Sequence, residues 1–83
     1  MNTIKFKQNG STPGVVLDKE SGMFQFTGES FPEDPYEFFN PIFQWFDTYS
    51  ENPLQSTVID FQLSYFNTVS AKNFLHIMGQ LEQ

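Results

Sequence analysis

The chain contains no cysteine and no arginine, and all four of its cationic side chains are lysines. Without cysteine it can form neither a disulfide nor a thiolate metal site. A single histidine then leaves mainly carboxylates as metal ligands, and their spacing is not typical of a metal site. We therefore expect no metal and no cofactor. The absence of thiols suits a reducing compartment, so we expect a cytoplasmic protein.

Positive charge and long apolar runs are also scarce. Ten acidic residues against four lysines give a net charge of −6, which disfavours nucleic acid and anionic membranes as partners. No apolar run is long enough for a signal peptide or a membrane span. Aromatic residues are plentiful, with eleven Phe, three Tyr and one Trp in 83 residues. This composition predicts one small domain over residues 1–83 with an aromatic core.

The first third of the chain has the alternation typical of strands. Thr3–Lys7 alternates weakly, which predicts a short first strand. Pro13–Leu17 and Met23–Thr27 alternate clearly, and Asp18–Gly22 between them is typical of a hairpin loop. Gly22 would supply the positive φ that such a loop needs. The sequence therefore predicts a sheet that begins with a hairpin.

A helix is predicted next, from an N-cap at Asp34 to about Tyr49. Its apolar face is wider than the stripe that a helix on one side of a sheet needs. Two interpretations follow. The aromatic residues form the core with a few exposed rings, or Phe39, Phe43 or Trp45 belongs to a protein–protein interface, where aromatics are enriched.

The last third of the chain changes from a strand pattern to a helix pattern. A strand beginning near Ser56 would place five residues on its apolar face: Thr57, Ile59, Phe61, Leu63 and Tyr65. Helical spacing follows at five further residues: Ala71, Phe74, Leu75, Met78 and Leu81. Asn67 or Thr68 is the natural N-cap at the joint.

A hydroxyl at this joint has two possible roles. The first backbone N–H groups of a helix lack acceptors within the helix, and the helix dipole adds positive potential there. A phosphate on Thr68 or Ser70 would meet those donors. The alternative is that Thr68 is only a helix N-cap in a structural or oligomerisation module.

Catalysis is the weakest hypothesis. It would rest on Asp60, which the strand pattern places on the polar face, and on His76, which falls on the polar side of the last helix. A general base needs a nucleophile or an orienting partner within hydrogen-bond reach, and none is evident. The glycines form no phosphate-binding or dinucleotide fingerprint. We therefore expect no enzyme activity.

Three stretches in order resemble one known family. They are Leu63–Lys72, the segment from Thr12-Pro13 through a hairpin ending in Phe26–Pro32, and the helix Glu37–Pro41 with Trp45. Together they resemble the SiaC-like biofilm-regulatory proteins over roughly residues 11 to 82. That family is in turn similar to the anti-sigma-factor antagonists of the STAS fold.

The resemblance implies a phosphorylation-switched adaptor in bacterial signalling. A partner Ser/Thr kinase and a phosphatase would set the state of a threonine between a strand and a helix, which corresponds to Thr68 here. The unphosphorylated form would bind and activate a diguanylate cyclase, an enzyme of cyclic di-GMP signalling. Tyr65, Phe66, Asn67 and Ser70 would flank the contact, and Lys72 one turn along would reach the phosphate.

The fold that we expect is α+β and STAS-like. It is a small mixed sheet of three or four strands with two helices mainly on one face, in the order β-β-β-α-β-α. Members of the family usually continue with at least one more strand and helix, so this chain is C-terminally short in comparison. An uncovered sheet edge is prone to pair with another chain, so a homodimer is also possible.

Overall fold

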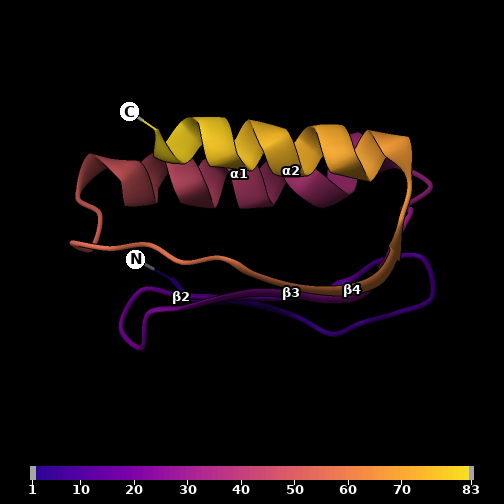
Figure 1. Cartoon of the computed structure of the whole chain (residues 1–83), viewed down its shortest axis with the longest axis horizontal. Coiled ribbons are helices and arrows are strands. Elements are labelled where there is room, and N and C mark those ends of the chain that lie inside the picture. Colours follow the sequence, from indigo (N-terminus) through magenta and orange to yellow (C-terminus); the bar gives the residue numbers. More distant parts are fainter. Residues whose placement is uncertain (1, 83) are drawn as a thin grey trace.

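The computed structural model describes residues 2–82 and forms one sheet covered by two helices (Figure 1). Its elements, in chain order, are β1 (Ile4–Phe6), β2 (Gly14–Asp18), β3 (Met23–Ser30), α1 (Pro35–Glu51), β4 (Asp60–Phe66) and α2 (Thr68–Leu81). This order and the α+β class confirm the prediction. Both helices lie on the same face of the sheet, so the fold has two layers.

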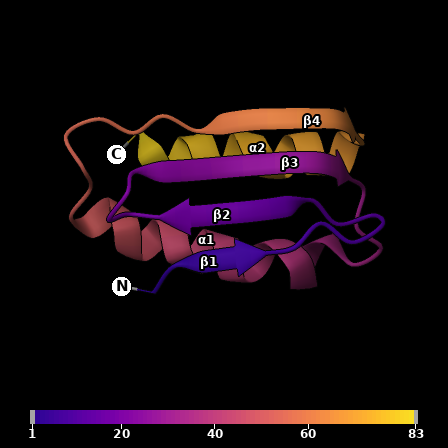
Figure 2. The ribbon, with the colours of Figure 1, turned by 90° about the horizontal axis from the view of Figure 1, so that it is seen from below.

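The four strands lie side by side in chain order (Figure 2). β1, β2 and β3 form an antiparallel meander, whereas β4 pairs parallel to β3 after the crossover through α1. The sheet is therefore mixed, as predicted. Within residues 2–82, β4 pairs with no strand on its outer side.

The hairpin between β2 and β3 closes as its residue types predict. Gly22 has a φ of 73°, and its N–H donates to the Lys19 carbonyl at 3.2 Å. The Asp18 carboxylate accepts from the Glu20 N–H at 3.1 Å and from the Ser21 hydroxyl at 2.9 Å. These bonds fix the turn and bring the alternating apolar residues of the two strands onto one face.

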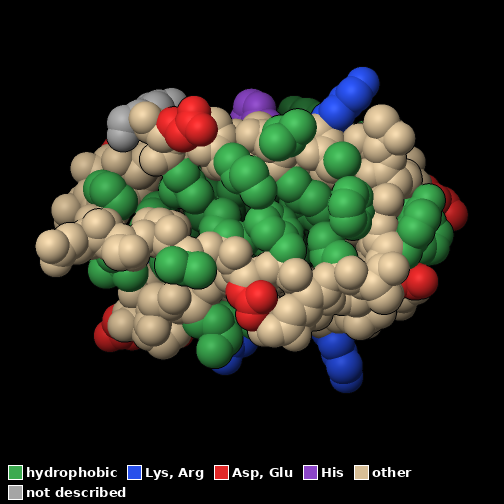
Figure 3. All heavy atoms as spheres, viewed as in Figure 1, with side chains coloured by type: hydrophobic (Ala, Val, Ile, Leu, Met, Phe, Trp, Pro, Cys, Tyr) green, Lys and Arg blue, Asp and Glu red, His purple; other side chains and the backbone are tan. Residues whose placement is uncertain are grey.

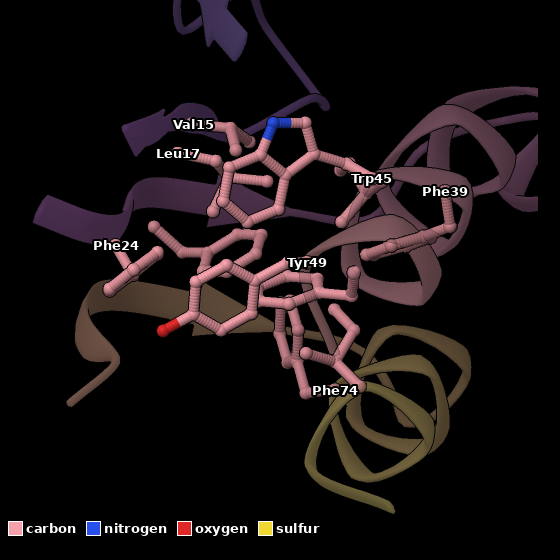
Figure 4. Close-up of a cluster of buried hydrophobic side chains, with 11 residues drawn as sticks. Val15, Leu17, Phe24, Phe39, Trp45, Tyr49 and Phe74 are labelled. Carbon is pink, nitrogen blue, oxygen red and sulfur yellow. The ribbon is translucent and has the colours of Figure 1, made fainter. Parts of the chain in front are cut away.

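α1 supplies most of the aromatic core (Figure 4). Asp34 caps it by accepting from the Glu37 N–H at 3.1 Å. The buried side chains from the sheet and both helices are Val15, Leu17, Phe24, Phe26, Phe39, Ile42, Trp45, Phe46, Tyr49, Phe74 and Ile77. Phe39 is fully buried and Trp45 is nearly so, while Phe43 is partly buried against the core. The core interpretation of the wide apolar face is thus correct for Phe39 and Trp45, and the interface interpretation is wrong for them.

The strand expected from about Ser56 begins later, at Asp60. The segment before β4 is hydrogen-bonded to the side chain of Tyr49, near the end of α1, instead of to β3. The Tyr49 hydroxyl lies 2.7 Å from the Thr57 hydroxyl and accepts from the Leu54 N–H at 3.2 Å. These side-chain bonds stabilise the connection as a loop, and alternation in the sequence does not reveal them.

A bulge changes the face of the last β4 residues. Gly28 pairs with Leu63, but the next residue of β3, Glu29, pairs with Tyr65, so Ser64 is the extra residue. Each extra residue in a strand reverses the facing of the residues after it. The expectation that Tyr65 shares a face with Leu63 is therefore wrong, because Tyr65 is exposed beside Glu29.

The apolar residues of α2 lie on two sides of the helix. Its buried residues are Ser70, Phe74, Ile77 and Gln80. Gln80 also ties α2 to α1, because its Nε2 donates to the Phe43 carbonyl at 2.9 Å and to the Asp47 carboxylate at 2.8 Å. Leu75 and Met78, which the spacing assigned to the core, are exposed. The predicted stripe is therefore correct for Phe74 and wrong for these two residues.

Candidate partner-binding site

The joint between β4 and α2 is held by Asn67. Its side-chain oxygen accepts from the Ser70 N–H at 2.8 Å, which makes Asn67 the N-cap. Its own N–H donates to the Ser30 carbonyl at 3.1 Å, and its carbonyl accepts from Ala71 at 3.0 Å. Thr68 is the first residue of the helix. The interpretation of Thr68 as the N-cap is therefore wrong.

The two hydroxyls that the sequence analysis considered for phosphorylation, those of Thr68 and Ser70, lie in different environments. Thr68 is exposed at the start of α2. Ser70 is fully buried, and its hydroxyl donates to the Ser30 carbonyl at 2.9 Å and lies 2.8 Å from the Ser30 hydroxyl. Ser70 is thus beneath the surface at this end of the molecule, and only Thr68 faces the solvent.

Exposed apolar side chains flank Thr68 in the chain. Tyr65 is 51% exposed, Phe66 is 50% exposed and Val69 is 46% exposed. Phe31 is 39% exposed and packs edge-on against Tyr65, with ring centroids 5.7 Å apart. We call Phe31, Tyr65, Phe66, Thr68 and Val69 the junction patch. Neighbouring exposed aromatics of this kind mark protein interaction sites.

The amino end of α2 favours an anion, whereas the exposed Glu29 of β3 lies beside Tyr65 on the neighbouring strand. The first turn of α2 contains no acidic residue, so nothing in it offsets the positive end of the helix dipole. Lys72 is exposed and follows Thr68 by one helical turn, a spacing at which two side chains are neighbours. A phosphate on Thr68 would therefore lie beside a cation and the amino end of a helix.

The alternative catalytic residues do not form a site. The Asp60 carboxylate accepts from the Gln62 side chain at 2.7 Å, and both are exposed on the outer face of the sheet. His76 packs on the Phe43 ring, with centroids 4.3 Å apart, on the helical layer. Across residues 2–82 no group of three His, Asp or Glu side chains is placed to hold a metal ion. In the same range no helix has the length and apolar character of a bilayer span.

Sequence reasoning named Tyr65, Phe66, Asn67, Ser70 and Lys72 around Thr68. The structure keeps Tyr65, Phe66 and Lys72 at the surface and adds two residues that the sequence analysis missed, Phe31 and Val69. Val69 could have been identified from its position next to Thr68. Phe31 lies 34 residues before Tyr65 in the chain, and only the parallel pairing of β3 with β4 brings them together.

The fold and this surface define a small α+β protein with exposed apolar side chains at a strand–helix joint and no metal-binding cluster among the described residues. The model of the SiaC family of regulatory phosphoproteins matches residues 6–83. The chain belongs to this family, which confirms the resemblance seen in its motifs. The family consists of regulatory proteins, in agreement with the expectation of a non-enzyme.

Individual relatives support the same assignment. An uncharacterized protein of Pseudomonas aeruginosa strain UCBPP-PA14 is 29% identical over 83 residues, which are all of this chain and 66% of the relative. The crystal structure of apo-SiaC from P. aeruginosa has a TM-score of 0.89 at 29% identity, over 99% of this chain and 68% of that one. The chain thus spans about two thirds of the length of these relatives.

A third similar structure contains a partner. It is the crystal structure of the diguanylate cyclase SiaD in complex with its activator SiaC from P. aeruginosa. The match has a TM-score of 0.86 and 29% identity, over 95% of this chain and 65% of that chain. In that organism a protein similar to this chain therefore binds a cyclase as its activator.

Proposed function

We propose that this protein is a phosphorylation-switched adaptor that binds and activates a diguanylate cyclase, with Thr68 as the phospho-acceptor. The observation that carries the proposal is the division of roles at the joint. Asn67 caps α2, Ser70 is buried, and Thr68 is exposed within an apolar patch. The SiaD–SiaC complex supports the class of partner. A protein kinase would add the phosphoryl group and a phosphatase would remove it, in the cytoplasm.

The proposed switch acts through the surface of the junction patch. Phosphorylation adds about −1.5 to −2 charges. The chain has no arginine to bind the phosphate internally, so the phosphate stays at the surface with Lys72 as its nearest cation along the helix. An interface that buries Phe31, Tyr65 and Phe66 would then also have to desolvate a dianion, which opposes binding. The unphosphorylated form is therefore the binding form.

Binding to SiaD from P. aeruginosa tests this function directly. We expect Thr68→Glu to weaken binding at least tenfold and to abolish stimulation of the cyclase, because it places a charge inside the apolar patch. Thr68→Val, which cannot be phosphorylated, should bind like the wild type. Thr48→Glu makes the matched substitution at an exposed threonine of α1 and should also bind normally. Equal binding by Thr68→Glu and wild type would sink the proposal.

Phosphorylation itself is tested by incubation with ATP and a protein kinase encoded beside the protein. Intact-mass analysis should show one phosphoryl group, and fragmentation should localise it to Thr68. The Thr68→Val variant should remain unmodified. Modification at another residue, with Thr68 unchanged, would refute the assignment of Thr68.

A further inference from the structure

β1 and the amino end of α1 form a groove at the edge of the sheet that lies opposite β4. Its volume is about 680 Å³, and every residue that lines it lies between Lys5 and Pro41 in the chain. Within residues 2–82, β1 pairs only with β2, so the backbone on its other side has no strand partner there. We call this groove the β1 groove. An edge strand beside a groove is a surface to which an extended peptide can add.

The β1 groove is remote from the part of the fold to which β4 and α2 lead. The strand that follows a β–α unit usually pairs with the strand of that unit through a right-handed crossover. For α2 this position is beside β4, where apolar side chains gather between the sheet and the helix (Figure 3). β1 is at the other edge of the sheet, and the groove lies where β1 ends and α1 begins (Figure 2). Residues 5–41 alone therefore form it.

Contacts at both ends of β1 hold the groove in shape. The Trp45 indole N–H donates to the carbonyl of Asn2, just before β1, at 2.6 Å. At the other end of the strand, Phe6 packs on Phe38 of α1 with ring centroids 5.8 Å apart. A surface that is already in place loses little conformational entropy on binding. The apolar floor of the β1 groove is thus preformed.

We propose that an extended peptide of a protein partner binds the β1 groove and pairs antiparallel with β1 as a fifth strand of the sheet. Lys5 and Lys7 are exposed on either side of Phe6, which is partly buried. Directly opposite residues on antiparallel strands point to the same face of the sheet. The peptide therefore presents an apolar side chain opposite Phe6 and an acidic side chain opposite each lysine. This inference goes beyond the adaptor function and does not depend on it.

Acidic side chains on the α1 side of the groove add a fourth position to the motif. α1 runs opposite to β1 (Figure 2), and Asp34 precedes Phe38 by about one turn, or about 6 Å along the helix. Alternate residues of a strand are about 6.8 Å apart and point to the same face. The peptide residue two positions before the apolar one thus lies near Asp34, where Glu33 and Glu37 also line the groove. A basic residue there gives the order basic–acidic–apolar–acidic.

The lysines argue against a second copy of this chain as the occupant. Antiparallel pairing of two β1 strands about an axis through Phe6 places Lys5 of each copy opposite Lys7 of the other. An axis through either lysine places that lysine opposite itself. Like charges directly opposite each other are destabilising. Charge complementarity therefore selects a partner strand with acidic residues at these two positions.

Peptide binding to the full protein tests the proposal. The probe is a fluorescein-labelled peptide with Lys-Glu-Leu-Glu at its centre, and fluorescence anisotropy should show saturable binding. A second peptide with Lys-Lys-Leu-Lys at its centre should bind at least tenfold more weakly. Because the chain carries a net charge of −6, non-specific attraction would give the opposite order. Failure of the first peptide to bind, or tighter binding of the second, would overturn the proposal.

Two double variants with the same net charge separate the groove from the rest of the surface. Lys5→Gln/Lys7→Gln removes two positive charges from the groove and should weaken binding of the first peptide at least tenfold. Gln44→Glu/Gln55→Glu adds two negative charges outside the lining and should change binding less than twofold. All four positions are exposed, so circular dichroism should show an intact fold in both variants. Equal binding by the two variants would refute the assignment of the lysines.

Amide hydrogen exchange identifies the strand that pairs with the peptide. Saturation with the first peptide should slow exchange at amides of β1 and leave the exchange of β4 unchanged. Protection of β4 in place of β1 would overturn the proposal. No residue of the junction patch lines the β1 groove, so the peptide test keeps its meaning whether or not Thr68 controls cyclase binding.

Discussion

The Ser30 and Ser70 hydroxyls lie 2.8 Å apart, forty positions from each other in the chain, and neither side chain is exposed. Ser70 also donates to the Ser30 carbonyl at 2.9 Å, and the same carbonyl accepts from the Asn67 N–H. The end of β3 is thereby bonded to the first turn of α2. This contact supports the joint directly beneath Thr68.

We expect Ser70→Ala to lower the free energy of unfolding by about 1–3 kcal/mol, because it leaves a buried hydroxyl and a carbonyl short of a partner. The Ser30→Ala/Ser70→Ala double variant should lose less than the sum of the two single variants, since they share one hydrogen bond. Urea denaturation measures both effects. Ser56→Ala is the control, because Ser56 is exposed in the loop before β4, and it should change the free energy by less than about 0.5 kcal/mol. Additive losses would contradict the coupling of the two hydroxyls.

Local patterns predicted most of the fold. The hairpin loop, the Asp34 cap and the change from strand to helix near Asn67 each depend on residues within a few positions of one another. The predicted start of β4 was wrong because the Tyr49 hydroxyl forms hydrogen bonds with the segment that precedes the strand. The predicted facing of Tyr65 was wrong because one bulged residue turns the following side chains of the strand to the other face of the sheet. Both errors come from contacts that are not encoded in local periodicity.

The roles of Asn67 and Thr68 can be separated by stability. Asn67→Ala should cost about 0.5–2 kcal/mol, because the Ser70 N–H loses its acceptor. Thr68→Ala should change stability by less than about 0.5 kcal/mol, as an exposed substitution outside the cap. Thermal and urea unfolding of both variants measure the difference. A larger loss for Thr68→Ala than for Asn67→Ala would restore the cap role to Thr68.

The candidate site shows the same limit of sequence reasoning. Thr68 and its neighbours in the chain could be found because a strand–helix joint has a recognisable pattern. The sequence could not choose between Asn67 and Thr68 as the cap, since both residue types occupy that position readily. Nor could it place Phe31, which reaches Tyr65 only through the register of β3 and β4.

The hairpin turn predicts a dependence of stability on pH. The hydrogen bond from the Ser21 hydroxyl is the main cause that lowers the pKa of Asp18 below its ordinary value of 3.8, and bonds from the Glu20 N–H and the Thr3 hydroxyl add to it. A carboxyl whose pKa is lower in the folded chain stabilises the fold at pH values above 3.8. This contribution is lost as the pH falls through the folded-state pKa.

Ser21→Ala should therefore raise the pKa of Asp18 toward 3.8, which carboxyl NMR titration measures directly. Asp18→Asn should be less stable than wild type near neutral pH, and this difference should shrink in acid, where the wild-type carboxyl is also neutral. Ser50→Ala is the control, because the Ser50 hydroxyl donates to the Asp47 carbonyl and does not contact the turn. An Asp18 pKa that is the same in Ser21→Ala and wild type would show that the turn hydroxyl does not stabilise the carboxylate.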